Sequence, residues 1–212
     1  MKKHLVLSLV LIVVMASCSR SEKGGTAASR IELEALVLLQ REGGGNILGS
    51  TSWKTWALRD GTWWIQRVES TRDLKHRESN DAWRSRGGVW NSRITRWHAT
   101  LPEAWWNDAE RLAGELRFFE QSEQAPDPGR FLDGNDQPTI VAISRTGRRR
   151  KVSKWDVDRV PDFDPLYEHL TILRKQIEKA DPEYEGTLNP TFPSEAEDDW
   201  QPPGFPSRKE TQ

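Results

Sequence analysis

The chain has one cysteine, Cys18, so no disulfide can form within it and the fold must be held by packing alone. Neither charge sign dominates: 31 basic residues face 32 acidic ones, for a formal net charge of −1. Such a chain lacks the overall positive field that attracts nucleic acid, and we expect no nucleic-acid partner. Tyrosine is scarce, with two residues, whereas tryptophan is abundant, with eleven.

The apolar run near the N-terminus is short. It extends from Leu5 to Met15, whereas a membrane-spanning helix needs about 20 residues. Lys2 and Lys3 precede the run, and Ala16-Ser17-Cys18 follows it. A basic start, a short apolar middle and small residues before a cleavage point are the layout of a secretory signal peptide.

Met15-Ala16-Ser17-Cys18 resembles the lipobox of bacterial lipoproteins. The resemblance implies that residues 1–17 are a lipoprotein signal peptide and that Cys18 carries lipid, including acyl chains such as palmitate. Ser19 after the cysteine implies, by the same likeness, a protein of the outer membrane that faces the periplasm. Two alternatives stay open: an ordinary signal peptide cut nearby, and an uncleaved membrane anchor.

The composition divides the rest of the chain into three parts. Residues 18–29 are small and polar and predict a lipidated tether, which as a flexible chain spans about 20 Å. Residues 30–180 predict a single domain. Residues 181–212 hold six of the twelve prolines and several acidic residues, so we expect a disordered tail.

Local patterns predict the elements of that domain. Residues 30–41 suit a strand, with Ile31, Leu33, Ala35, Val37 and Leu39 on one face; the alternative is a helix, which the Glu and Leu residues of the segment also suit. Turns at Asp60-Gly61 and Thr146-Gly147 join two pairs of strands into hairpins. A long loop is expected over residues 70–88 and a short strand over 89–100.

Two amphipathic helices complete the prediction. One begins with a capping box of Thr100 and Glu103 and continues to about Glu120, with Trp105, Ala109, Leu112, Ala113, Leu116 and Phe119 on its apolar stripe. The other begins at Asp164-Pro165, with Leu166, Leu170, Leu173 and Ile177 on one stripe. The expected fold class is α+β: an antiparallel sheet built from two β-hairpins plus an N-terminal strand, with two helices packed on one face.

The second half of the domain carries a series of short motifs in a fixed order. They are Leu101-Pro102-Glu103, Phe118-Phe119-Glu120, Asp136-Gln137-Pro138-Thr139-Ile140, Gly147, Lys151-Val152 and Pro165-Leu166, with Gly43 and Gly44 after the first strand. This series is similar to the emfourin-like family of small bacterial proteins, some of which inhibit metallopeptidases. The resemblance implies the fold and, as one possible activity, peptidase inhibition; it assigns no inhibitory residue.

Tryptophan supplies the first candidate binding residues. In the pairs Trp63-Trp64 and Trp105-Trp106, one indole can enter the core while its neighbour is left towards solvent. Exposed indoles stack on sugars, aromatic rings and cations. We therefore expect Trp64, Trp97 and Trp106 to form part of a binding face for a glycan or a protein; the alternative is that they serve core packing and arginine stacking.

Basic residues of the second hairpin supply the other candidate surface. Arg148, Arg149, Arg150, Lys151 and Lys154 follow one another closely, and such clusters attract anionic lipid headgroups or an acidic partner. The alternative is an edge strand whose charges discourage aggregation, or a patch covered by the acidic tail.

Motifs for catalysis or metal binding are not evident. His76, His98 and His169 lack the spacing of a zinc site, and residues 133–136 resemble a calcium loop in composition only. We expect no cofactor, no metal and no enzymatic activity. The sequence thus predicts a membrane-anchored lipoprotein of the cell envelope that binds a protein or glycan, with a tethered peptidase inhibitor as the alternative and an envelope hydrolase as a third.

Overall fold

The computed structural model describes residues 31–42, 49–72, 78–85, 90–124, 137–155, 159–177, 180–188 and 200–206. The expected signal peptide, Cys18 and the tether lie outside these residues, as do His76 and residues 133–136.

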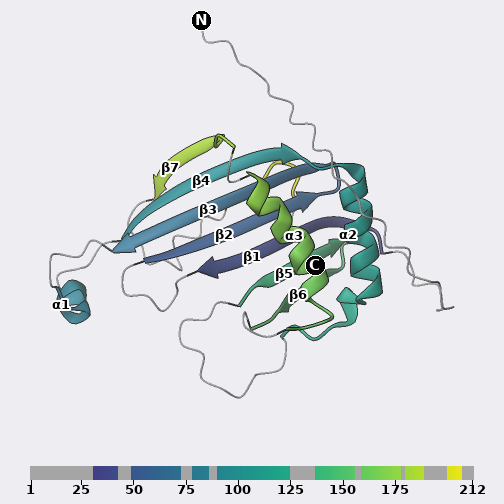
Figure 1. The fold of residues 1–212 in the computed structure, drawn as a ribbon, viewed down its shortest axis with the longest axis horizontal. Helices are drawn as coiled ribbons and strands as arrows, with labels where there is room; N and C mark the ends of the chain where they lie inside the picture. The colour runs from purple at the N-terminus through teal and green to yellow at the C-terminus, as the bar shows by residue number, and fades with distance from the viewer. Residues whose placement is uncertain are drawn as a thin grey trace, which may run out of the picture.

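The described strands form one seven-stranded antiparallel sheet in the order β6-β5-β1-β2-β3-β4-β7 (Figure 1). Their bounds are β1 (Leu33–Glu42), β2 (Gly49–Leu58), β3 (Thr62–Arg72), β4 (Trp90–Thr100), β5 (Thr139–Ser144), β6 (Arg149–Ser153) and β7 (Tyr184–Leu188). This confirms the predicted α+β class, the N-terminal strand and both hairpins.

The two predicted hairpin turns have the backbone that their glycines allow. Gly61 has φ 84° and Gly147 has φ 83°, in the left-handed region that side-chain-bearing residues rarely adopt. The Asp60 carboxylate accepts a 2.8 Å hydrogen bond from the backbone N–H of Thr62 and so closes the first turn. Asp-Gly therefore fixes the register of β2 on β3.

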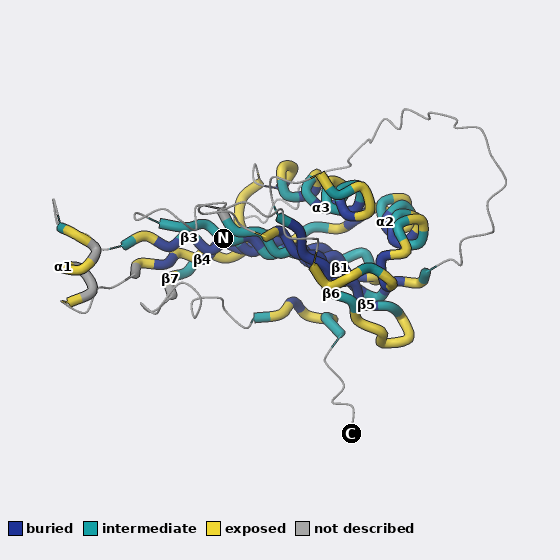
Figure 2. The backbone as a smooth tube through the Cα atoms, turned by 90° about the horizontal axis from the view of Figure 1, so that it is seen from below, coloured by how far each residue is buried: buried dark blue, intermediate teal, exposed yellow. Residues whose placement is uncertain are grey.

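Helices α2 (Glu103–Glu115) and α3 (Asp164–Ile177) cover one face of the sheet, which we call the helix face (Figure 2). The buried stripe of α3 is the predicted one. At α2 the predicted capping box is wrong: the N-cap is Pro102, without a side-chain cap, because Thr100 is still paired in β4. This helix also ends before Glu120, since Arg117 has φ 46° and a short 3₁₀ turn, η1 (Phe118–Glu120), follows.

The segment predicted as a long loop is partly regular. Strand β3 extends to Arg72, and a short helix, α1 (Asn80–Ser85), follows within the expected loop. Strand β4 occupies the range predicted for a strand, residues 89–100, and all eleven of its residues pair with β3. Charged side chains fit this part of the sheet because those of Glu69 and Arg72 are only half-buried and that of Arg93 is exposed.

Strand β1 does not keep one apolar face along its whole length. Its pairing with β5 shifts between Leu33 and Ala35. Leu33 therefore packs in the helix-face core, while Ala35 and Val37 belong to the core on the opposite side. A bulge adds one residue and so changes the face of every side chain beyond it, which strict alternation cannot anticipate.

The prediction of a disordered tail is wrong for residues 184–188 and 200–206. Strand β7 pairs with the edge of β4, so backbone groups of both strands are satisfied. Residues 200–206, here called the C-terminal strap, lie against the face opposite the helices, here called the strap face (Figure 2). Trp200 and Phe205 supply the apolar surface that makes this packing favourable, despite the surrounding prolines.

Candidate functional site

The three indoles expected to share a binding face do not lie together. Trp97 and Trp106 are buried in the helix-face core, whereas Trp64 is half-buried on the strap face. The prediction that these three residues share one binding face is therefore wrong.

Trp97 is part of a cation-and-indole stack beneath α3. Its ring stacks on that of Trp53 at 6.3 Å, and the Arg67 guanidinium lies 5.4 Å and 5.5 Å from the two ring centroids. Its indole N–H donates a 3.1 Å hydrogen bond to the backbone carbonyl of Ala180. These contacts match the alternative of core packing and arginine stacking for Trp97.

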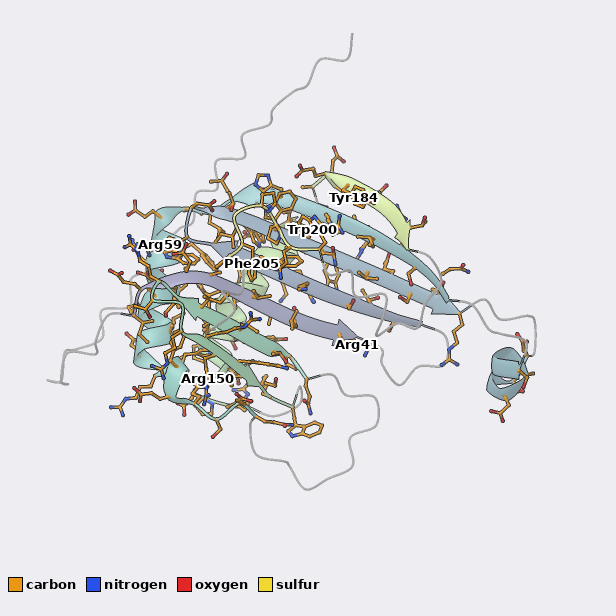
Figure 3. The ribbon with its side chains drawn as sticks, turned by 180° about the vertical axis from the view of Figure 1, so that it is seen from behind. Arg41, Arg59, Arg150, Tyr184, Trp200 and Phe205 are labelled. Atoms are coloured by element: carbon orange, nitrogen blue, oxygen red, sulfur yellow. The ribbon has the colours of Figure 1, made fainter. Side chains whose placement is uncertain are left out.

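Trp64 belongs to a different group of rings. It is paired across the sheet with His98, and the two rings stack at 4.5 Å. On its other side it meets Trp200 of the strap edge-on, at 5.2 Å. Trp56, which is 1% exposed, meets the same Trp200 ring at 5.4 Å. The indoles of Trp56 and Trp64 thus form a cluster on the strap face with that of Trp200, which comes from the C-terminal strap and is labelled in Figure 3.

Cations border these rings. The Arg96 guanidinium lies 4.3 Å from the ring centroid of Trp200 and 4.8 Å from that of Tyr184. Its Nε donates a 2.7 Å hydrogen bond to the Gln66 side-chain oxygen, which fixes the orientation of the plane. The Lys54 ammonium lies 5.0 Å from the ring of Trp56. Rings next to oriented cations suit ligands that offer flat apolar groups or acidic groups.

Part of this cluster reaches the surface. The side chain of His98 is 38% exposed, and Tyr184, which is 46% exposed, pairs across the sheet with Arg96. We call Trp64, His98 and Tyr184 the aromatic rim. Nδ1 of His98 lies 3.8 Å from the Glu183 carboxylate, which places an acidic side chain beside the rim.

The five basic residues of the second hairpin do not form one exposed patch. Arg148 donates a 2.8 Å hydrogen bond to the carbonyl of Phe119, and Arg150 donates to the carbonyl of Gln121. Both guanidinium groups therefore hold the segment after α2 against the sheet.

Of the three remaining cations of the hairpin, one is also used within the fold and two are exposed. Lys154 is buried and forms a 2.7 Å ion pair with Asp164 at the start of α3. Arg149 and Lys151 are exposed and pair with Ile143 and Val141, whose side chains belong to the strap-face core. Two of the five predicted residues thus remain for an anionic lipid or an acidic partner.

His169 is held at the contact between the two helices. Its ring stacks on Trp105 at 4.4 Å, and Nε2 lies 3.0 Å from the Trp105 carbonyl, to which the neutral ring donates. Burial lowers the pKa of His169 from its ordinary value, against the opposing effect of that hydrogen bond. This histidine is structural, because indole and backbone occupy its ring face and one nitrogen.

Within the described ranges, no group of three or more His, Cys, Asp or Glu side chains is placed to hold a metal ion. Over the same residues, no helix has both the length and the apolar character needed to cross a membrane.

Sequence reasoning missed Arg96, His98, Tyr184, Trp200 and Phe205. A signal was present at the C-terminal end, where two aromatic residues flank Pro202-Pro203-Gly204. Disordered segments contain few aromatic residues, so bulky aromatic residues in a proline-rich stretch indicate that the stretch packs against the domain.

Comparison of the chain with protein-family models, with curated proteins and with solved structures found no match. The similarity to the emfourin-like family, and the peptidase inhibition that it implies, therefore stay predictions made from the residues alone.

Proposed function

We propose that the chain is a lipid-anchored protein of the bacterial cell envelope that acts by binding a protein or glycan partner at its aromatic rim. Lipid on Cys18 attaches it to the membrane, and the short tether keeps the domain near the bilayer surface. The fold presents the binding residues and does no chemistry on the partner.

The observation that carries this proposal is the difference between the two faces of the sheet. Two helices cover the helix face, whereas among the described residues the strap is the segment packed over the central strands on the other face. One indole (Trp64), one imidazole (His98) and one phenol (Tyr184) remain at least partly accessible beside it. Aromatic residues are enriched where proteins bind partners, because they bury large areas at low entropic cost.

The paired positions of the rim support recognition of a flat or extended ligand. Trp64 and His98 stand opposite each other on β3 and β4, and Tyr184 follows on β7. Three neighbouring strands thus contribute one ring each to the same face. Stacking on such a row requires an elongated partner surface, such as a glycan chain or a peptide segment.

The test compares rim and control variants of the full-length protein. We expect His98→Ala/Tyr184→Ala to bind isolated sacculi or solubilised envelope proteins at least tenfold more weakly than the wild type in sedimentation assays. The matched control is Ile172→Ala, which removes a side chain that is 53% exposed on α3. Binding that is absent in the wild type, or equal in all three proteins, would contradict the proposal.

A further inference from the structure

The C-terminal strap has the composition of a peptide ligand. Residues 200–206 read Trp-Gln-Pro-Pro-Gly-Phe-Pro. Pro202 is buried and Trp200 and Phe205 are half-buried, whereas Gln201 and Pro203 are exposed. The strap is therefore anchored at three positions, Trp200, Pro202 and Phe205, and leaves the residues between them in solvent.

Trp200 is the main anchor. Its ring meets Trp56 and Trp64 edge-on, at interplanar angles of 84° and 67°, and the Arg96 guanidinium lies over it. Two indole walls and one cation thus surround a third indole. Edge-to-face indole contacts and a cation over the ring both depend on orientation, so the seat selects for an aromatic group of this size.

The rest of the strap follows the rules for proline-rich ligands. Such segments lose little conformational entropy on binding and dock on surfaces lined by aromatic rings. The backbone N–H of Phe205 donates a 3.1 Å hydrogen bond to the carbonyl of Pro202, and Gly204 between them has φ 79°. This turn brings Phe205 back to the strap-face core.

The sequence before Trp200 and the surface of the sheet also carry opposite charges. Asp198 and Asp199 directly precede Trp200 in the sequence. On the sheet, Arg96 and Lys54 border the rings that receive Trp200. An acidic residue before the aromatic anchor therefore suits this face.

We propose that the seat of the strap is a binding site for acidic, proline-rich segments of a partner protein with an aromatic anchor, and that the chain's own strap is an internal ligand which competes for it. This inference rests on the proposed binding function and names its ligand class. Because the strap belongs to the same chain, its local concentration is on the order of millimolar. A partner segment must exceed that competition to displace it.

The experiment offers the ligand in trans. A fluorescein-labelled peptide of residues 198–207 is titrated against the full-length wild type and against Trp200→Ala/Phe205→Ala, and binding is followed by anisotropy. We expect the variant to bind at least tenfold more tightly than the wild type, since its own strap no longer competes. A peptide with both aromatic residues replaced by alanine is expected not to bind.

The matched control is Gln201→Ala, which alters an exposed strap residue outside the turn and is expected to behave as the wild type. If circular dichroism shows that the double anchor variant does not fold, Phe205→Ala, which retains Trp200, replaces it, with an expected threefold gain in peptide binding over the wild type.

Several results would overturn the inference. One is a folded anchor variant that does not bind the peptide; another is equal binding by every variant. Concentration-dependent dimers of the wild type that the free peptide dissociates would assign the seat to the strap of a second copy instead. Loss of peptide binding while the rim still binds glycan or envelope protein would refute this inference alone and leave the proposed function standing.

Discussion

Glu110 shows how a charged residue can belong to the core of this domain. Its side chain is 2% exposed, and one carboxylate oxygen accepts hydrogen bonds from the backbone N–H of Leu33, the indole of Trp106 and the guanidinium of Arg59. A buried carboxylate is tolerated when charged and polar donors replace water in this way. The residue joins α2 to the bulge at the start of β1.

Replacement of Glu110 by alanine should therefore be costly. It leaves the N–H of Leu33 and the indole N–H of Trp106 without their acceptor, and we expect a loss of about 3 kcal/mol in unfolding free energy. Urea denaturation measures it. Glu115→Ala on the exposed side of the same helix is the control, with an expected change within about 0.5 kcal/mol. Equal losses in the two variants would refute the role given to Glu110.

Glu110 also explains why the sequence misplaces Trp106. Counting this glutamate as solvent-facing turns the apparent apolar stripe of α2 towards Trp105 and Leu112, whereas the buried residues are Trp106, Ala109, Glu110 and Ala113. For Trp63 and Trp64 the prediction is better. The alternation of a strand places Trp63 in the helix-face core and Trp64 on the opposite, strap face. In a strand, the faces of successive side chains follow from the backbone alone. The partners that allow a polar side chain such as Glu110 to be buried are known only from the tertiary structure.

At the scale of elements, α2 and α3 meet through His169 and Trp105. Asp108 and Arg111 on α2 also act on this histidine, the first favouring its charged form and the second opposing it. Burial prevails, so the folded protein holds the proton on His169 less tightly than the unfolded chain does. Protonation therefore works against the packing of α3 on α2.

The pH dependence follows from that direction. A histidine whose pKa is lowered on folding contributes stability above its unfolded pKa of about 6.5, and this contribution is lost as pH falls from that value through the lower pKa of the folded state. We expect the unfolding free energy of the wild type to decrease more steeply between about pH 7 and pH 5 than that of His169→Gln. The amide of glutamine can still donate to the Trp105 carbonyl but does not titrate. Parallel curves from thermal or urea unfolding would show that His169 has no such effect.

Elements with strong local signals are the ones that the sequence predicted well. The Asp60-Gly61 turn and the stripe of α3 depend on residues close together in the chain, and both agree with the structure. Strand β7 was missed because its short sequence, Tyr-Glu-Gly-Thr-Leu, gains stability by pairing with the edge of β4, far away in the chain. Edge pairing is a property of the sheet and not of the segment.

At the scale of the whole molecule, the proposed membrane location depends on Cys18, which lies outside the described residues. We expect Cys18→Ala to move the protein from the membrane fraction to the soluble fraction of its host, since no thiol remains to carry the lipid. Stable anchoring needs more than one acyl chain, so the wild type should stay with the membrane in high salt. Fractionation with immunoblotting measures this, and a wild type found in the cytosol without lipid would refute the anchor.

The sequence by itself determined the α+β class, the hairpins and the apolar stripe of α3, because turn residues and apolar periodicity act over a few neighbouring positions. Only the tertiary structure decided which indoles are buried, that Arg148, Arg150 and Lys154 are used within the fold, and that the strap returns to the sheet. These outcomes depend on contacts between residues as distant as Trp56 and Trp200, and such contacts form only once the sheet has brought its strands together.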